Sequence, residues 1–148
     1  MLNYPESSPL IEYKHELRSR YGETDKMGYV YHGKYLEYFE VARTEMIRSY
    51  GISYRVLEDN GVMLPVIDAA VQFKSPIFYD ESIVIKVQVF EEPSIRLKTY
   101  YQVYAKEREM LCVQGMVTLV FMSEENRRPC RAPQYFMEKF KSAISDYK

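Results

Sequence analysis

The 148-residue sequence contains no tryptophan, only two cysteines and two histidines, and a formal net charge of -1 at pH 7. Cys112 and Cys130 are too few for a disulfide framework, so we expect a reducing compartment, the cytoplasm. Lysines and arginines are scattered among glutamates and form no basic block, which argues against a nucleic-acid partner. No apolar run approaches the roughly 20 residues that cross a bilayer, and the N-terminus lacks the pattern of a signal peptide, so stable membrane insertion is not expected.

The sequence also lacks a glycine-rich phosphate loop and a cluster of residues with metal-ligand spacing. We therefore expect no bound metal and no resident cofactor. No internal repeat or low-complexity segment interrupts the chain, and 47% of its residues are hydrophobic, so we predict one domain over residues 1–148. Tyrosine is abundant, with 15 copies, and suits half-buried sheet faces and a subunit interface or pocket.

The hydrophobic pattern predicts mostly strands around one long helix. Residues 1–11 are expected to be a flexible arm, and alternation predicts a first strand over 13–21. Apolar residues at three- and four-residue spacing predict a helix over 34–50 with one buried face, formed by Tyr35, Phe39, Ala42, Met46 and Tyr50. A short helix at 54–59, strands at 63–75, 83–90, 95–106 and 110–122, and a closing helix at 133–147 complete the expected elements. Four residues should share one side of the closing helix: Phe136, Phe140, Ile144 and Tyr147.

Short connections between the last four strands predict an antiparallel, meander-like sheet, and Pro65 predicts that the first of them is either irregular or at an edge near its start. The helix at 34–50 is the one sizeable element able to cover a sheet face, so the sheet should curl around it. Leu36, Val41 and Ile47 broaden its apolar surface, so we expect protein to surround the helix on most sides. The predicted fold class is therefore α+β, a curved antiparallel sheet of about five strands wrapped around a long central helix. Tyrosines and methionines on the other sheet face argue for a partner subunit.

A polar cluster stands immediately before the long helix. Asp25, Gly28 and His32 lie in a turn-rich stretch at the point where the helix should begin. Free backbone N–H groups and the positive end of the helix dipole favour developing negative charge there. This part of the chain is suited to chemistry on an oxygen atom.

The cluster resembles that of the hot dog fold acyl-CoA thioesterases, specifically the 4-hydroxybenzoyl-CoA thioesterase-like group that includes the YbgC-type enzymes. The resemblance covers roughly residues 12–125. It implies the hot dog fold, hydrolysis of an acyl-CoA substrate, and a homo-oligomer, either a dimer or a dimer of dimers, with the pocket between two subunits. It rests on Tyr21, Thr24-Asp25, Gly28, Val30-Tyr31-His32, Tyr35, Phe39-Glu40 and Arg43, with support from Lys74-Ser75-Pro76 and Tyr79-Asp80.

Asp25 is the predicted catalytic residue. Hydrolysis of a thioester needs a carboxylate nucleophile, which gives a mixed anhydride, or a carboxylate base that activates water, and the resemblance implies that Asp25 holds one of these roles. The alternative is an aspartate that only accepts backbone N–H bonds in the turn. Convergence of a titratable group, an oxyanion donor and a pocket at one place favours catalysis.

The resemblance also implies a backbone oxyanion donor at or beside His32, from either His32 or Tyr31. The His32 side chain either orients water or Asp25, or packs as a polar residue at the helix start. Tyr21 either positions Asp25 or the acyl group through its hydroxyl, or is an ordinary sheet tyrosine. Gly28 is expected to let the turn pass close to the ligand.

Coenzyme A carries phosphates, so the pocket rim needs cations. The candidates are Lys74 with Ser75, Arg96 with Lys98, and Arg127 with Arg128, and each of them taken alone is more simply explained as solvated surface. Glu40 and Arg43, three residues apart on the helix, are expected to form a buried or interfacial ion pair. The alternative that the resemblance allows is that Glu40 lies near the active site of the partner subunit.

Two other functions remain open from the sequence. The same fold could hold an acyl chain or lipid without chemistry, although such a binding module has little use for a carboxylate at the helix start. It could also be a catalytically silent hot dog subunit of a larger assembly. The preferred acyl group is not indicated by any of these residues.

Overall fold

Five strands form one antiparallel sheet in the computed structural model, which describes residues 2–147. Their order across the sheet is β1-β4-β5-β6-β3. The strands are β1 (Ile11–Arg18), β3 (Val66–Phe73), β4 (Ser82–Val89), β5 (Arg96–Ala105) and β6 (Met110–Val120). Two short strands, β2 (Val62–Met63) and β7 (Met122–Ser123), pair separately.

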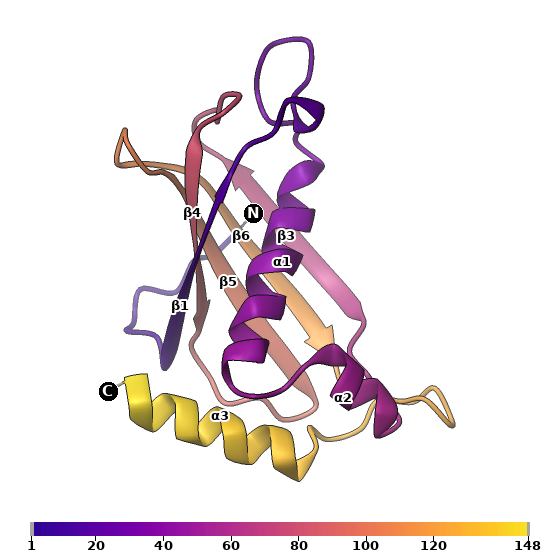
Figure 1. The fold of residues 1–148 in the computed structure, drawn as a ribbon. Helices are drawn as coiled ribbons and strands as arrows, with labels where there is room; N and C mark the ends of the chain where they lie inside the picture. The colour runs from indigo at the N-terminus through magenta and orange to yellow at the C-terminus, as the bar shows by residue number, and fades with distance from the viewer. Residues whose placement is uncertain (1, 148) are drawn as a thin grey trace.

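Three α-helices accompany the sheet: α1 (Lys34–Ser49), α2 (Tyr54–Asp59) and α3 (Gln134–Tyr147). A 3-10 turn, η1, covers Tyr21–Glu23. Figure 1 shows α1 lying along one face of the sheet between β1 and β3, with α3 near the end of the sheet where α1 stops. The predicted α+β class, with a curved antiparallel sheet around a long helix, is confirmed.

The strand order corrects one detail of the prediction. β4, β5 and β6 are consecutive neighbours and form the expected meander, but β3 pairs with β6 at the sheet edge and not with β4. The segment between β3 and β4, residues 74–81, is long enough to carry the chain across the sheet, so the rule for short connections does not apply to it. β3 begins directly after Pro65, and the predicted edge position is confirmed.

The core lies between α1 and the inner face of the sheet. Phe39 is fully buried and stacks on Tyr101 with a centroid distance of 4.2 Å. Four of the five residues predicted for the buried helix face are buried, and Tyr50 is half-buried. Leu36 and Val41, however, are each 45% exposed, so within one chain α1 is not enclosed on most sides. The sheet of a single chain covers only one side of the helix.

Residues near both termini contact the paired strands β1 and β4. On α3, Phe136, Phe140 and Ile144 are buried as predicted, whereas Tyr147 is 45% exposed and its hydroxyl donates to Glu12. In the segment before β1, the ring of Tyr4 lies edge to face with the Tyr100 ring at 5.4 Å, so this residue contacts the outer sheet face.

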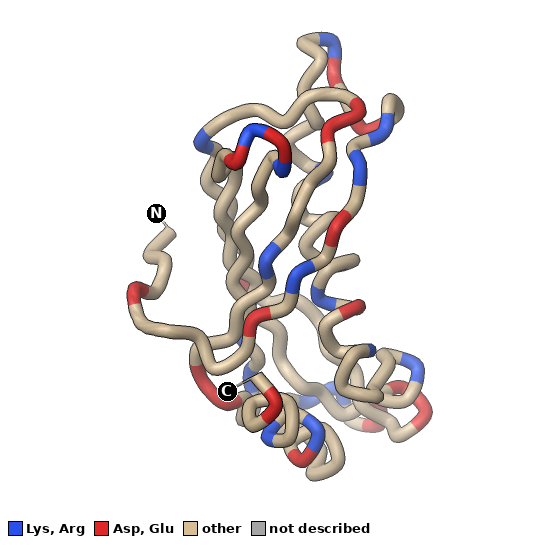
Figure 2. Tube along the Cα trace, turned by 60° about the vertical axis from the view of Figure 1, so that its left-hand side comes forward, with Lys and Arg blue, Asp and Glu red and all other residues tan. Residues whose placement is uncertain are grey.

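Charges of both signs alternate over the molecule, and Figure 2 shows blue and red segments interspersed along the chain. In this view the Lys and Arg positions form no long unbroken stretch of the traced chain. Among residues 2–147, no helix combines the length and the apolar character that crossing a bilayer would require.

Candidate active site

The Asp25 turn connects η1 to α1 at one end of the sheet. The Asp25 N–H donates to the Tyr29 carbonyl at 2.8 Å, and the Gly28 N–H donates back to the Asp25 carbonyl at 3.0 Å. Gly28 has a φ of 81°, a left-handed conformation that favours glycine at this point of the turn. Val30 N–H then donates to the Ile77 carbonyl and ties the turn to the segment before β4.

The carboxylate of Asp25 is half-buried and has one fixed oxygen. Oδ1 accepts the Met27 N–H at 2.9 Å, which is the bond that a purely structural aspartate would make. Oδ2 makes no hydrogen bond to any residue between 2 and 147. The side chain is therefore oriented by the turn while one oxygen stays available to water or a ligand.

A surface hollow of about 810 Å³ lies beside this carboxylate. Asp25, Gly28 and Tyr21 line it together, and Tyr79 is a further lining residue that the resemblance included only as support. The rings of Tyr21 and Tyr79 meet edge to face at 5.7 Å, and the Tyr21 side chain is 78% exposed. In a single chain the hollow is open, with two aromatic side chains at its rim.

The two predicted oxyanion donors differ in the structure. The Tyr31 N–H already donates to the Glu23 carbonyl at 2.8 Å, whereas the His32 N–H has no acceptor in the described part of the chain. Gly33, the N-cap residue of α1, supplies no side-chain cap, so the first N–H groups of the helix are not satisfied by a capping side chain. The exposed His32 ring lies against the Tyr31 ring at 4.3 Å and does not line the Asp25 hollow.

Comparison with known proteins decides the family. The profile of the Thioesterase-like superfamily matches residues 19–140. The chain belongs to this superfamily. A Bacillus subtilis protein provisionally named acyl-CoA thioesterase YneP is 32% identical over 83% of this chain and 88% of its own. The YbgC acyl-CoA thioester hydrolase of Escherichia coli is 26% identical over 84% of this chain and 92% of its own.

A solved relative in the same superfamily supports both the fold and the class. The DHNA-CoA thioesterase of Staphylococcus aureus is 36% identical, with a TM-score of 0.82, over 92% of this chain and 90% of its own. The hot dog fold and the assignment of the chain to thioester hydrolases, both predicted from the resemblance, are confirmed.

The residues predicted to bind CoA lie at two opposite ends of the sheet. Lys74 and Ser75 lie at the Asp25 end, where their N–H groups donate to the Cys112 carbonyl. Arg96 and Lys98 lie at the other end, at the start of β5, which runs roughly 30 Å to its last residue. Arg127 and Arg128, in the loop after β7, are at this far end as well, since Ser123 N–H donates to the Arg128 carbonyl.

Glu40 and Arg43 do not form the expected ion pair. Arg43 donates from Nε to Tyr54 Oη at 2.9 Å and from Nη1 to Tyr101 Oη at 3.0 Å, and no carboxylate of residues 2–147 lies within ion-pair distance. Tyr101 Oη in turn shares a hydrogen bond with Thr99 Oγ1. Burial lowers the pKa of Arg43, but the two tyrosine hydroxyls raise it overall. The helix therefore turns Arg43 into the core while Glu40 stays exposed.

The contacts of the Glu23 carboxylate near the site were not predicted from the sequence. Glu23 Oε1 accepts the Arg20 N–H at 2.8 Å and the Tyr38 hydroxyl at 2.7 Å, and Lys34 Nζ lies 3.9 Å from Glu23 Oε2. Burial raises the pKa of Tyr38, and the bond to Glu23 raises it further. Glu23 thus fastens the loop before the helix to the helix itself, through residues whose spacing follows no motif.

Proposed function

We propose that this protein hydrolyses acyl-CoA thioesters to a free acid and CoA. The observation that carries the proposal is the Asp25 carboxylate, which has one oxygen fixed by Met27 N–H and the other available, in a hollow also lined by Tyr21 and Tyr79. The names of the Bacillus and Escherichia relatives and of the Staphylococcus structure all refer to CoA thioesters, which supports CoA as the leaving group.

Asp25 acts as base or as nucleophile. As a base, it takes a proton from water while the water oxygen attacks the thioester carbonyl, the C–S bond breaks, and the CoA thiolate is protonated. As a nucleophile, its free oxygen displaces the thiolate and forms a mixed anhydride that water then hydrolyses. Both routes consume one water and place negative charge on the carbonyl oxygen, where the His32 N–H is the proposed donor.

Tyr21, the His32 side chain and Gly28 support this chemistry in the proposal. Tyr21 lines the same hollow as Asp25 and presents a hydroxyl at its rim, where it can contact the acyl group. The His32 ring is exposed and can orient water. Gly28 lets the backbone approach the substrate closely, because no side chain projects from the turn there.

The substrate site is proposed to be completed by a second copy of the chain, in a dimer or a dimer of dimers. β3 is an open sheet edge, and its Val66 and Phe73 are 52% and 54% exposed. Leu36 and Val41 on α1 add further exposed apolar surface. An antiparallel β3–β3 pairing about a two-fold axis would set the far end of one chain beside the Asp25 end of the other.

This arrangement gives both groups of cations a place near one substrate. Lys74 and Ser75 would come from the chain that supplies Asp25. Arg96, Lys98, Arg127 and Arg128 would come from its partner, because within a single chain they lie at the other end of the sheet. We propose that CoA phosphates are bound by a subset of these residues.

The proposed reaction uses only water and groups of the protein chain, and CoA enters as part of the substrate. We propose a cytoplasmic location for it. Cys112 and Cys130 are both free, which is compatible with a reducing compartment.

The test is CoA release by Asp25→Asn and Asp25→Ala over a panel of aliphatic and aromatic acyl-CoAs. We expect kcat/KM to fall by about 100- to 10,000-fold in both variants, because the base or nucleophile is removed. Release is followed by chromatography, so that the two protein thiols do not contribute. The same panel identifies the preferred acyl group.

Asp146→Asn is the matched control, since Asp146 is an exposed residue of α3, away from the hollow. It should retain wild-type turnover. Wild-type turnover in both Asp25 variants would exclude the assigned role and leave the turn-forming bond to Met27 as the function of this side chain. Saturable acyl-CoA binding without release by the wild-type protein would instead support a binding module.

A further inference from the structure

Asp25 and His32, which the proposed reaction needs, are placed by one small hairpin, residues 23–31, which we call the Asp25 hairpin. Its two strands are joined at the open end by the Tyr31 N–H, which donates to the Glu23 carbonyl at 2.8 Å. Asp25 lies on the first strand, and His32 directly follows the second. The separation between the Asp25 carboxylate and the His32 N–H therefore depends on how firmly each strand is held.

The two strands of the Asp25 hairpin are held differently. The second strand is tied to the segment before β4, because the Val30 N–H donates to the Ile77 carbonyl at 2.8 Å. Among residues 2–147, the first strand forms no backbone hydrogen bond to any segment outside residues 20–31. The strand that carries the proposed catalytic carboxylate is thus the outer one, and a side chain has to fasten it.

The Glu23 carboxylate supplies this fastening. Its Oε1 accepts the Tyr38 hydroxyl at 2.7 Å and the Arg20 N–H at 2.8 Å, and Oε2 lies 3.9 Å from Lys34 Nζ. Only 14% of the Glu23 side chain and 3% of Tyr38 are exposed, so water competes little for the bond between them. Burial, and then the bond to Glu23, raises the pKa of Tyr38, so its hydroxyl stays protonated and donates. The bond joins the outer strand to α1.

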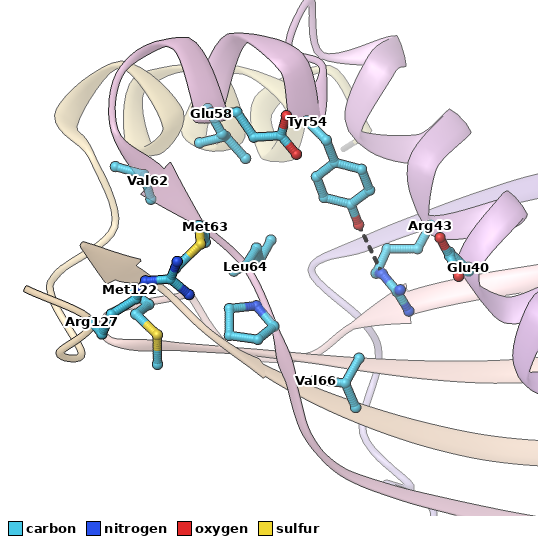
Figure 3. Close-up of a pocket in the computed structure, with 12 residues that line it drawn as sticks. Glu40, Arg43, Tyr54, Glu58, Val62, Met63, Leu64, Val66, Met122 and Arg127 are labelled. Atoms are coloured by element: carbon cyan, nitrogen blue, oxygen red, sulfur yellow. Dashed lines mark hydrogen bonds between the residues drawn. The ribbon is translucent and has the colours of Figure 1, made fainter. Parts of the chain in front are cut away.

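The bond from Arg43 to Tyr54 of α2 cannot do the same, because it lies further along α1, beside a cavity (Figure 3). Arg43 follows the first residue of α1 by nine positions, or about 14 Å along the helix axis. Tyr38 follows it by four positions, or about 6 Å. The contact between Tyr38 and Glu23 therefore acts where α1 begins, about one turn from the proposed oxyanion donor.

We propose that Glu23, acting through Tyr38, is a positioning residue for thioester hydrolysis, which holds the Asp25 carboxylate at a fixed distance from the His32 N–H. This inference rests on the proposed function. A base or nucleophile and an oxyanion donor act on the same carbonyl group, so an error of about 1 Å in their separation can cost about 100-fold in rate. Substrate binding does not need that separation, so the loss should fall on kcat and not on KM.

The first test is steady-state kinetics with the panel acyl-CoA that the wild-type protein hydrolyses fastest. Tyr38→Phe removes one hydroxyl and keeps the buried ring, and Glu23→Ala removes the carboxylate. We expect kcat to fall by about 10- to 100-fold in both, with KM within about twofold of wild type. Glu23→Gln should stay within about threefold of wild-type kcat, because its amide oxygen can still accept the Tyr38 hydroxyl.

Tyr147→Phe is the matched control. The Tyr147 hydroxyl also donates to a carboxylate, that of Glu12, but it lies on α3. This variant should keep the wild-type kcat and KM.

A double variant tests whether the effect of Tyr38 passes through Asp25. Tyr38→Phe/Asp25→Asn should turn over no more slowly than Asp25→Asn alone, because no catalytic carboxylate is left to misplace. A tyrosine that only supported the fold would slow the wild-type and Asp25→Asn backgrounds by the same factor.

Amide hydrogen exchange, followed by NMR, measures the fastening without turnover. Tyr38→Phe and Glu23→Ala should raise the exchange rates of the Asp25 and Tyr31 amides at least about tenfold, because the outer strand opens more often. The Val30 amide, which is tied to Ile77, should change by less than about twofold.

Unchanged kcat or unchanged exchange in Tyr38→Phe would overturn the proposal, and so would an equal loss in the wild-type and Asp25→Asn backgrounds. Tyr38→Phe and Glu23→Gln keep the test decisive if Glu23→Ala does not fold. Failure of the proposed function gives a different result, in which Asp25→Asn keeps wild-type turnover or the wild-type protein releases no CoA. The exchange rates then decide by themselves whether Glu23 holds the hairpin.

Discussion

Gly115, in β6, is where the sheet and the central helix approach most closely. A Cβ at this position would lie 2.3 Å from Phe39 Cε2 and 2.4 Å from Cζ. The Phe39 ring cannot easily move away, because it is fully buried and stacked on Tyr101. Glycine is needed here for space, and not for an unusual backbone angle.

Gly115→Ala should therefore lower the free energy of unfolding by about 1–3 kcal/mol, the usual cost of overpacking a core. Urea denaturation followed by circular dichroism measures the change. Gly22→Ala is the control, since a Cβ there would meet nothing within 4 Å, and it should change stability by less than about 0.5 kcal/mol. Equal losses in the two variants would contradict the close-approach argument.

Between elements, an ion pair joins the β5–β6 turn to the segment before β4. Arg108 donates from Nε to Glu81 Oε2 at 2.9 Å and from Nη2 to Glu81 Oε1 at 2.6 Å. Phe78 N–H donates to the same carboxylate at 2.9 Å, and Arg108 also reaches the Pro76 carbonyl. The Arg108 bond holds the pKa of Glu81 below its ordinary value of 4.5.

This pair makes stability depend on pH in a defined direction. Because the folded-state pKa of Glu81 is depressed, its contribution is present above the unfolded pKa and is lost as the pH falls through the lower folded value. Arg108→Met should cost about 0.5–1 kcal/mol at pH 7, a value reduced by partial solvent exposure of the pair. The cost should be smaller at pH 3, which lies below the ordinary pKa of 4.5, because protonation of Glu81 weakens its pairing with Arg108.

Urea titrations of both proteins at pH 7 and pH 3 measure this difference. Lys106→Met, which removes a more exposed pair with Glu16, is the comparison and should cost less at pH 7. An Arg108→Met cost that is the same at both pH values would show that the carboxylate is not responsible.

For the whole molecule, the open β3 edge and the uncovered side of α1 form one apolar surface. The Phe73 ring lies 5.7 Å from the Tyr35 ring, so β3 and the start of α1 are adjacent at this surface. Large exposed apolar surfaces beside an unpaired strand are expected to be covered by another chain. A second copy is the proposed cover.

The double variant Val66→Lys/Phe73→Lys should dissociate the oligomer, because it places charge at both ends of the β3 edge. Size-exclusion chromatography with light scattering should show a shift toward the mass of a single chain. Acyl-CoA turnover should fall at least about tenfold, since partner cations would no longer reach the Asp25 end.

Val56→Lys/Tyr147→Lys is the control pair, because both residues are exposed large apolar residues on α2 and α3 and not on β3. This variant should keep the oligomer and its activity. If instead the wild-type protein is a single chain, or the β3 variant remains assembled with full turnover, β3 pairing is not the interface.

Periodicity was enough to predict the long helix, its buried residues, the main strands and the fold class, because apolar spacing records which side of an element faces the core. The resemblance of the residues around Asp25 was enough to predict the superfamily. Both are local properties of the chain, readable over a few turns of helix or one strand.

Contacts between distant residues followed no such local pattern. The pairing of β3 with β6, the bond from Tyr38 to Glu23 and the turning of Arg43 toward Tyr101 and away from Glu40 each join segments that meet only after folding. The separation of the candidate CoA-binding residues to opposite ends of the sheet is of the same kind. Spacing along one element shows which face a side chain occupies, whereas its partner depends on which other element packs against that face.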